Sequence, residues 1–437
     1  MPPPYRGTVD RAWYTEADRE RLQRRSLRVL LLSQVLSGAG LAAGITVGAL
    51  LAEDMLGTTG LSGLPTALFT FGSAAAAMVV GALSDRRGRR TGLAAGYAAG
   101  AVGGAGVALA AVLDSVPLLL VALLVYGAGT ATNLQARYAG ADLALPERRG
   151  TAVSTILVGT TLGAVAGPNV VQPVGRLAEA SGIPSLAGPF ALAALAYGLA
   201  AVVLLVQLRP DPLLVARALT AQQDAVASEQ RRLSGAAAPV EQEVDRAALR
   251  LGGTSMVVTQ LVMVAVMTMT PVHMRDHGHG LGATGLVIGL HVAAMFLPSP
   301  VTGRLADRYG PRPVAAAGGV ALLGAGLTAT TAPDDSVALL SVALVLLGLG
   351  WTLGLLAGTT LVAAAVPAHG RGRVQGRLDV AVALAGATGG ITSGVVVAGT
   401  SYGTLASVSG VLAFAVLAAA VRHDRPSADA GSARVSR

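Results

Sequence analysis

The sequence predicts an all-α membrane protein, with twelve transmembrane helices in two pseudo-symmetric six-helix bundles. Three observations support this fold class. Hydrophobic residues make up 53% of the 437 residues and charged residues only 13%, a composition that excludes an ordinary soluble enzyme. About twelve uncharged apolar stretches are long enough to cross a bilayer. A loop motif of the first half also recurs in the second half.

The expected spans contain mostly Gly, Ala and Leu and lack the alternation of a β-strand, so helices must satisfy the backbone in lipid. A polar linker with balanced charge, 209–252, divides the chain into bundles at 28–208 and 253–421, and the terminal segments are 1–27 and 422–437. We expect this linker to be a solvated spacer with some amphipathic helix. The spans are 28–51, 61–83, 92–113, 117–141, 150–172, 187–208, 253–272, 284–302, 314–332, 337–364, 377–399 and 404–421.

Arginines gather in alternate loops, namely those after the second, fourth, eighth and tenth spans. The opposite loops hold only Arg176 and Arg275. By the positive-inside rule, the arginine-rich loops and both termini are cytoplasmic, in a multi-pass protein of the cell membrane. The net charge of +8 therefore indicates topology, and we expect a monomer in the lipid bilayer that binds no nucleic acid. Segment 1–27 lacks the features of a cleaved signal peptide.

An internal repeat relates the two halves by a shift of 222 residues. The loop GALSDRRGRR at 81–90 matches GRLADRYGPR at 303–312, and the same shift takes Gly150 to Gly372. Parallel repeats of this kind place a substrate path between the halves, near the middle of the membrane. The repeated positions are Gly81, Asp85, Arg86, Gly88 and Arg90 in the first loop and Gly303, Asp307, Arg308, Gly310 and Arg312 in the second.

This doubled loop in a twelve-helix chain resembles that of the major facilitator superfamily. The resemblance implies transport by alternating access, in which the two loops act as a cytoplasmic latch. In this sequence Asp85 is suited to cap a helix N-terminus, whose positive end favours a carboxylate. Arg89 or Arg90 is expected to pair with acids or carbonyls of the opposing bundle.

Methionine and histidine are concentrated at the start of the second half. The chain has no cysteine, so these residues are its only soft metal ligands, and they suit Cu(I). Met263 and Met267 share a face of one expected helix, and His291 and Met295 share a face of the next. These four residues form a predicted copper site. The repeat shift replaces them with residues that do not bind Cu(I) in this way: Leu41, Ile45, Phe69 and Ser73.

The two pairs, M-x-x-x-M and H-x-x-x-M, are similar to motifs of the CcoA-like copper-uptake branch of the superfamily. The resemblance implies copper import, although related members of that branch carry riboflavin. The loop HMRDHGH at 273–279 contains four residues that would collect metal on the outer side: His273, Met274, His277 and His279. A solvated loop without metal fits the same residues.

Polar residues inside the spans mark candidates for a substrate path or for ion coupling. Arg137, with Asn133 nearby, would contact an anionic substrate or form a proton-linked network with Asp142, or else snorkel to the cytoplasmic face. Asp379 is expected to be an acid at the N-terminus of its helix, with proton coupling as the alternative. Gln34 and Gln260 are further candidates for the path.

The sequence therefore predicts a secondary active transporter that needs no cofactor. Its leading substrate is Cu(I), taken up through Met263, Met267, His291 and Met295. The alternative is proton-coupled transport of a small organic molecule, either drug-like efflux or riboflavin-type uptake. A non-transporting membrane sensor is a further class, which the intact motif in both halves disfavours. No constellation of enzymatic residues is apparent.

Overall fold

The computed structural model describes residues 14–56, 64–234, 244–367 and 370–423, and these residues form helices without any strand. The helices of the first half are α1 (Glu16–Leu56), α2 (Leu64–Arg87), α3 (Arg89–Leu113), α4 (Val116–Ala141), α5 (Arg149–Ala180) and α6 (Gly188–Gln207). The linker contains α7 (Pro212–Ser234). The second half contains α8 (Arg246–Asp276), α9 (Leu281–Phe296), α10 (Ser299–Tyr309), α11 (Pro311–Thr331), α12 (Val337–Ala365), α13 (Arg371–Gly399) and α14 (Tyr402–His423).

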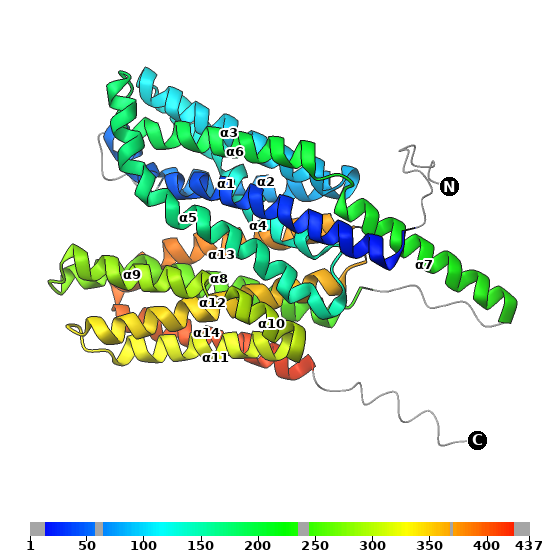
Figure 1. Cartoon of the computed structure of the whole chain (residues 1–437). Coiled ribbons are helices and arrows are strands. Elements are labelled where there is room, and N and C mark those ends of the chain that lie inside the picture. Colours follow the sequence, from blue (N-terminus) through cyan, green and yellow to red (C-terminus); the bar gives the residue numbers. More distant parts are fainter. Residues whose placement is uncertain (1–13, 57–63, 235–243, 368–369, 424–437) are drawn as a thin grey trace.

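The number of membrane spans agrees with the predicted fold class. Ten segments of the described chain are long and apolar enough to cross a membrane, on α2, α3, α4, α6, α8, α9 with α10, and α11 to α14. Helices α1 and α5, with 41 and 32 residues, are long enough for the other two expected spans. Helices α1 to α6 form one bundle and α8 to α14 the other, while α7 projects from one end (Figure 1).

The span expected at 284–302 is two helices rather than one. Helix α9 ends at Phe296 and α10 begins at Ser299. Pro298 and Pro300 cause this interruption, because proline has no backbone N–H and its ring clashes with the preceding helical turn. The two pieces together make the one span that the sequence predicts here.

Each bundle has its own hydrophobic core. In the first bundle, the core includes aromatic rings of α3, α4 and α6: Tyr126 packs edge-on against Phe190 at 5.4 Å, and Tyr97 stacks on Tyr197 at 5.7 Å between ring centroids. In the second bundle, leucines of α11 and α12 and methionines of α8 fill the core. A third cluster crosses between the halves and packs residues of α4 and α5 against α10, α11 and α12.

The halves meet closely at the end of the molecule formed by the starts of α3, α5, α11 and α13, which we call the latch end. There α2 crosses α13 at Gly81 and Gly372, and α10 crosses α5 at Gly303 and Gly150. A Cβ atom on Gly372 would lie 2.7 Å from the carbonyl oxygen of Gly81, and one on Gly303 would lie 2.7 Å from that of Gly150. Glycine permits this backbone contact. The two crossings are equivalent under the 222-residue shift, so the repeat builds a symmetric closure.

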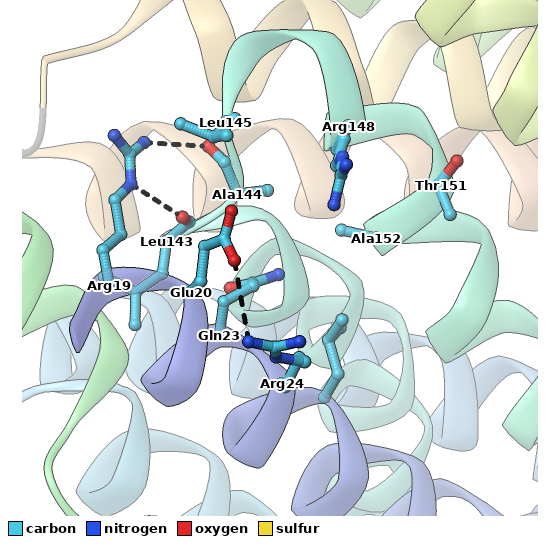
Figure 2. A pocket seen from close by; sticks show the side chains of 11 residues that line it. Arg19, Glu20, Gln23, Arg24, Leu143, Ala144, Leu145, Arg148, Thr151 and Ala152 are labelled. Atoms are coloured by element: carbon cyan, nitrogen blue, oxygen red, sulfur yellow. Dashed lines mark hydrogen bonds and ion pairs between the residues drawn. The ribbon is translucent and has the colours of Figure 1, made fainter. Parts of the chain in front are cut away.

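The first turns of α1 also belong to the latch end. Arg19 donates hydrogen bonds to the carbonyl oxygens of Leu143 and Ala144 at 3.0 and 3.2 Å, as Figure 2 shows. Gln23 donates to the carbonyl oxygen of Gly140 at 2.7 Å. The bond to Gly140 satisfies a carbonyl in the last turn of α4 that the helix itself leaves without a partner, and the other two bonds satisfy carbonyls of the segment after this helix. The first turns of α1 therefore hold the connection between α4 and α5.

Replacing Gly372 by Val should separate the halves at the latch end, because the added side chain would overlap the backbone of Gly81. Nitroxide labels on Arg87→Cys and Arg377→Cys, introduced into a chain that has no cysteine of its own, report this by electron–electron distance measurement. We expect a longer and broader distance distribution. Gly394→Val on the same helix is the control, since its Cβ meets nothing within 4 Å. Identical distributions in the two variants would contradict the tight crossing.

Candidate functional site

Two aspartates of the repeated loops bind the N-termini of helices in the opposite half. Asp85 accepts a hydrogen bond from the backbone N–H of Gly370, the residue before α13, at 3.0 Å. Asp307 accepts from the backbone N–H groups of Gly150 and Thr151 at 2.6 and 2.9 Å, at the start of α5. A carboxylate there compensates the positive end of the helix dipole. The helix-capping role expected of Asp85 is present, and Asp307 repeats it.

The linker helix is attached to the first of these contacts. Arg217 of α7 forms an ion pair with Asp85 at 2.5 Å and also donates to the carbonyl oxygen of Asp85. Asp211 accepts from the backbone N–H of Arg90 at 2.7 Å. Leu213 and Val215 are buried. The first turns of α7 are thus packed against the latch end, while the second half of the helix is mostly exposed.

The arginines of the motif have unequal roles. Arg86 and Arg308 are exposed, and the guanidinium of Arg308 lies over the ring of Tyr309. Arg89, by contrast, is completely buried and pairs with Asp142 at 2.7 Å. It also donates to Gln375 of the opposite half. Of the two arginines expected to pair across the halves, the structure gives this contact to Arg89.

Asp142 links Arg89 to a second arginine. Arg371, the first residue of α13, approaches the same carboxylate at 3.4 Å. Asp142 is therefore shared by arginines from both halves, with its side chain 1% exposed. It does not contact Arg137 through any described hydrogen bond or ion pair, so the proton-linked network expected between Arg137 and Asp142 is not what the structure forms.

Arg137 also forms a fully buried charge pair, and its partner comes from the other half. Its guanidinium lies 2.7 Å from the carboxylate of Asp379, and the two side chains are 0% and 1% exposed. Arg137 also donates to the hydroxyl of Thr359 at 2.9 Å, and the phenol of Tyr138 lies 3.5 Å from the same carboxylate oxygen. This burial also shows that Arg137 does not snorkel to the surface.

The prediction that Asp379 stands at a helix N-terminus is wrong, because α13 begins at Arg371, two turns earlier. One carboxylate oxygen, Oδ1, binds Arg137. The other, Oδ2, is buried and finds no hydrogen-bond partner in the part of the chain that the structure describes. Asp379 is thus a buried acid with one oxygen available to accept a proton.

The charge pair breaks the symmetry of the repeat. The 222-residue shift takes Arg137 to Thr359, so that Arg137 hydrogen-bonds to its own repeat counterpart. It takes Asp379 back to Leu157, which carries no charge. The repeat therefore contains one such pair rather than two.

Two of the predicted path residues are satisfied within the first bundle. Gln34 accepts a hydrogen bond from the hydroxyl of Tyr97 and donates to the carbonyl oxygen of Asn133 at 3.2 Å. The hydroxyl of Ser37 donates to the side-chain oxygen of Asn133 at 2.7 Å. All four side chains are buried. This polar cluster ties α1, α3 and α4 together.

Gln260 lies in the second bundle beside an aromatic pair. It accepts a hydrogen bond from the indole N–H of Trp351 at 2.9 Å, and the Trp351 ring packs edge-on against Phe296 at 5.5 Å. Its amide nitrogen faces Gly386 of α13. Gln260 is partly accessible, so its amide donors remain available to a ligand beside two aromatic rings.

The structure distributes the predicted copper ligands around α12. Met263 and Met295 are buried in one hydrophobic cluster, against which Met267 packs. His291 is turned toward α12, where its Nδ1 lies 2.8 Å from the carbonyl oxygen of Leu344. Its Nε2 is buried and has no hydrogen-bond partner among the described residues. Helices α8 and α9 contact α12 far more than each other.

Sequence reasoning missed Gln375, Arg371 and Thr359 as members of the site. A signal was present for the first two, because Arg371, Gln375 and Asp379 are spaced by four and share one face of α13. Helical spacing alone does not show which neighbour such a face meets. No comparable signal indicates Thr359, whose role depends on its position opposite Arg137.

The two six-helix bundles are homologous, and reciprocal contacts join them at one end. This arrangement is that of a membrane transporter whose substrate path lies between its two halves. The sequence model of the Major Facilitator Superfamily matches residues 30–240 and 251–436. The chain belongs to this family, whose members are transporters and not enzymes.

The relatives and structural neighbours agree with this assignment. The chain is 54% identical to the uncharacterized MFS-type transporter YdeG of Bacillus subtilis (strain 168), over 91% of each chain. It is 29% identical to the riboflavin transporter RfnT of Brucella anthropi, over 82% of this chain and 85% of the relative. Its fold is similar to that of the human organic anion transporter MFSD10, with a TM-score of 0.72 and 18% identity over 91% of this chain and 99% of the other.

Replacing Asp379 by Asn should destabilise the protein, because it leaves the Arg137 charge buried without a counter-charge. Loss of one partner from a buried pair costs about 3–5 kcal/mol in soluble proteins. We expect a lower unfolding temperature for purified Asp379→Asn. The double variant Arg137→Met with Asp379→Asn should recover part of the loss. Asp335→Asn, on an exposed turn, is the control for lost negative charge. A double variant less stable than either single variant would contradict the pairing.

Proposed function

We propose that this transporter takes up a small organic solute of the riboflavin type, together with protons, across the cell membrane. The positive-inside rule places the latch end and both termini in the cytoplasm. The closed latch end then corresponds to a state in which the substrate path is shut toward the cytoplasm. Opening it requires the two halves to rock apart about the central site.

The observation that carries the proposal is the buried pair between Arg137 and Asp379. Because the pair joins the two halves, rocking them apart at the latch end separates the charges. Asp379 then needs another positive partner, and a proton on its unpartnered oxygen satisfies it. Arg137 in turn needs an anion or a polar ligand. Proton binding and opening are thereby linked through one carboxylate.

The substrate class rests on two separate supports. The riboflavin transporter RfnT is similar to most of this chain. In addition, Gln260 beside Trp351 and Phe296 offers amide hydrogen bonds and aromatic faces, which suit a flat heterocycle with polar edges. These residues lie on α8, α9 and α12, within one half.

Uptake of radiolabelled riboflavin by cells that express the protein tests the coupling. We expect accumulation that increases when the outside is made acidic. Asp379→Asn should abolish this dependence on the pH gradient, because the amide takes up no proton in this range, while Asp335→Asn should retain it. Accumulation by Asp379→Asn that responds to the gradient as the unmutated protein does would contradict the role of this carboxylate.

Gln260→Leu tests the substrate class separately. The substitution removes the amide donors and retains a side chain of similar size. We expect the concentration for half-maximal uptake to rise about tenfold, the effect of roughly one lost hydrogen bond to a ligand, with the response to the pH gradient unchanged. An unchanged half-saturation concentration would contradict the contact.

Copper(I) uptake is a second candidate, favoured by His291. Its free Nε2 and the hydrogen bond of its Nδ1 to a carbonyl are the arrangement of a metal-binding imidazole, and Met295 lies one turn along the same helix. Copper uptake by cells that express Met263→Leu or His291→Leu tests this function. It predicts reduced uptake in both variants, and uptake equal to that of the unmutated protein would exclude it.

A further inference from the structure

Two histidines and an aspartate gather at the end of the second bundle opposite the latch end. His273 lies in the last turn of α8, His277 lies four residues further on as the residue that follows this helix, and Asp334 lies in the turn between α11 and α12. The Nε2 of His273 is 3.6 Å from one carboxylate oxygen of Asp334, and the Nε2 of His277 is 3.5 Å from the other. One ligand atom from each of the three residues fits within a mutual distance of 4.8 Å.

These distances are longer than hydrogen bonds and close to the separation of ligands around a metal ion. Zinc binds histidine nitrogen and carboxylate oxygen at about 2.0–2.2 Å, so neighbouring ligands of a tetrahedral site lie roughly 3.4 Å apart. A cation between the three residues would therefore need only a small movement of the exposed Asp334 side chain, which is 66% exposed.

The surroundings of the two imidazoles hold them in the orientation that a metal requires. The Nδ1 of His277 lies 2.8 Å from the carbonyl oxygen of His273, so that its Nδ1–H donates there and Nε2 keeps its lone pair. The ring of His273 stacks on Tyr402 of α14, with centroids 4.4 Å apart and planes at 13°. The His273 side chain is 10% exposed, and its ring has little freedom to turn away.

We propose that His273, His277 and Asp334 bind a divalent metal ion of the zinc class at this end of the second bundle, with a water molecule in the fourth position. Two imidazoles and one carboxylate are ligands that favour Zn²⁺ over Mg²⁺ or Ca²⁺. The set differs from the one expected from the loop sequence. Met274 is buried in the core, the Nε2 of His279 lies 2.9 Å from the backbone carbonyl oxygen of Asp334, and the carboxylate of Asp334 joins the two remaining histidines.

The proposed ion would join two parts of the second bundle. It would fix the last turn of α8 to the turn between α11 and α12, next to Tyr402. The last turn of α8 follows Pro271, which interrupts the hydrogen bonds of the helix. A bound ion would therefore restrict the position of this turn. The site is separate from Asp379 and Gln260, and its existence does not depend on the solute or on proton coupling.

Titration of the purified full-length protein with ZnCl₂ tests the proposal, with the protein prepared without a polyhistidine tag. We expect one ion per chain by calorimetry and a rise in unfolding temperature with Zn²⁺. His277→Ala and Asp334→Asn should each bind at least about tenfold more weakly. Asp335→Asn is the matched control, because it removes the same charge from the neighbouring exposed residue, and it should bind like the unmutated protein.

Three outcomes would overturn the proposal. They are the absence of Zn²⁺ binding by the unmutated protein, unchanged binding by both His277→Ala and Asp334→Asn, and equal weakening by Asp335→Asn. Unfolding temperatures measured without metal separate a damaged fold from a lost site. A parallel titration with Cu(I) distinguishes the proposed zinc-class site from a copper site in the same loop. The proposal expects Asp334→Asn to weaken the binding of Zn²⁺ but not the binding of Cu(I).

Discussion

Buried arginines whose partners come from the opposite half hold the latch end of this transporter together. A guanidinium in the apolar interior of a helix bundle has no water to solvate it and must find acceptors within the protein. Arg137 finds Asp379 and Thr359, and Arg89 finds Asp142 and Gln375. Because Asp379 belongs to the second bundle, the charge of Arg137 is neutralised only while the two halves are in contact, whereas Arg89 has the carboxylate of Asp142 in its own half and only the Gln375 amide from the other.

The contacts at the latch end form layers that differ in symmetry. The outer layer consists of Asp85 and Asp307 on the N-termini of α13 and α5, and the repeat relates one contact to the other. The inner layers lack this relation, because the shift takes Arg89 to Pro311 and Asp142 to Ala364. Gene duplication thus accounts for the outer contacts of Asp85 and Asp307, whereas the buried charge pairs have no counterpart in the repeat. The proton coupling that we propose uses the inner, asymmetric layer, because it needs an acid whose environment changes between the two states.

The fold could be predicted from the sequence because length and hydropathy leave few choices in a bilayer. The repeated loop also indicated the contacts of Asp85 and Asp307, because equivalent residues in two copies of one motif make equivalent contacts. The partners of Arg137 could not be predicted in the same way. Asp142 is near Arg137 in sequence, but Asp379, 242 residues away, is near it in space. Only the packing of α4 on α13 determines which carboxylate pairs with the Arg137 guanidinium. The helix boundary at Arg371 was missed because an arginine-rich first turn reads as a loop in a hydropathy profile.

The methionine and histidine region shows a further limit of spacing arguments. A shared helical face predicts that two side chains point the same way, but it does not show what they meet. His291 meets the carbonyl oxygen of Leu344, Met274 meets the core, and His273 and His277 meet Asp334 from a distant turn. The soft ligands that appeared as one group along the sequence are therefore divided between the interior of the bundle and one of its ends.

The central claim is that the pair between Arg137 and Asp379 keeps the two halves together at the latch end. Its most direct test is the distance between nitroxide labels at positions 87 and 377, measured in lipid for the unmutated pair and for Asp379→Asn. The account predicts one dominant short distance with Asp379 present and a substantial population of longer distances in Asp379→Asn. Superimposable distributions in the two proteins would contradict it.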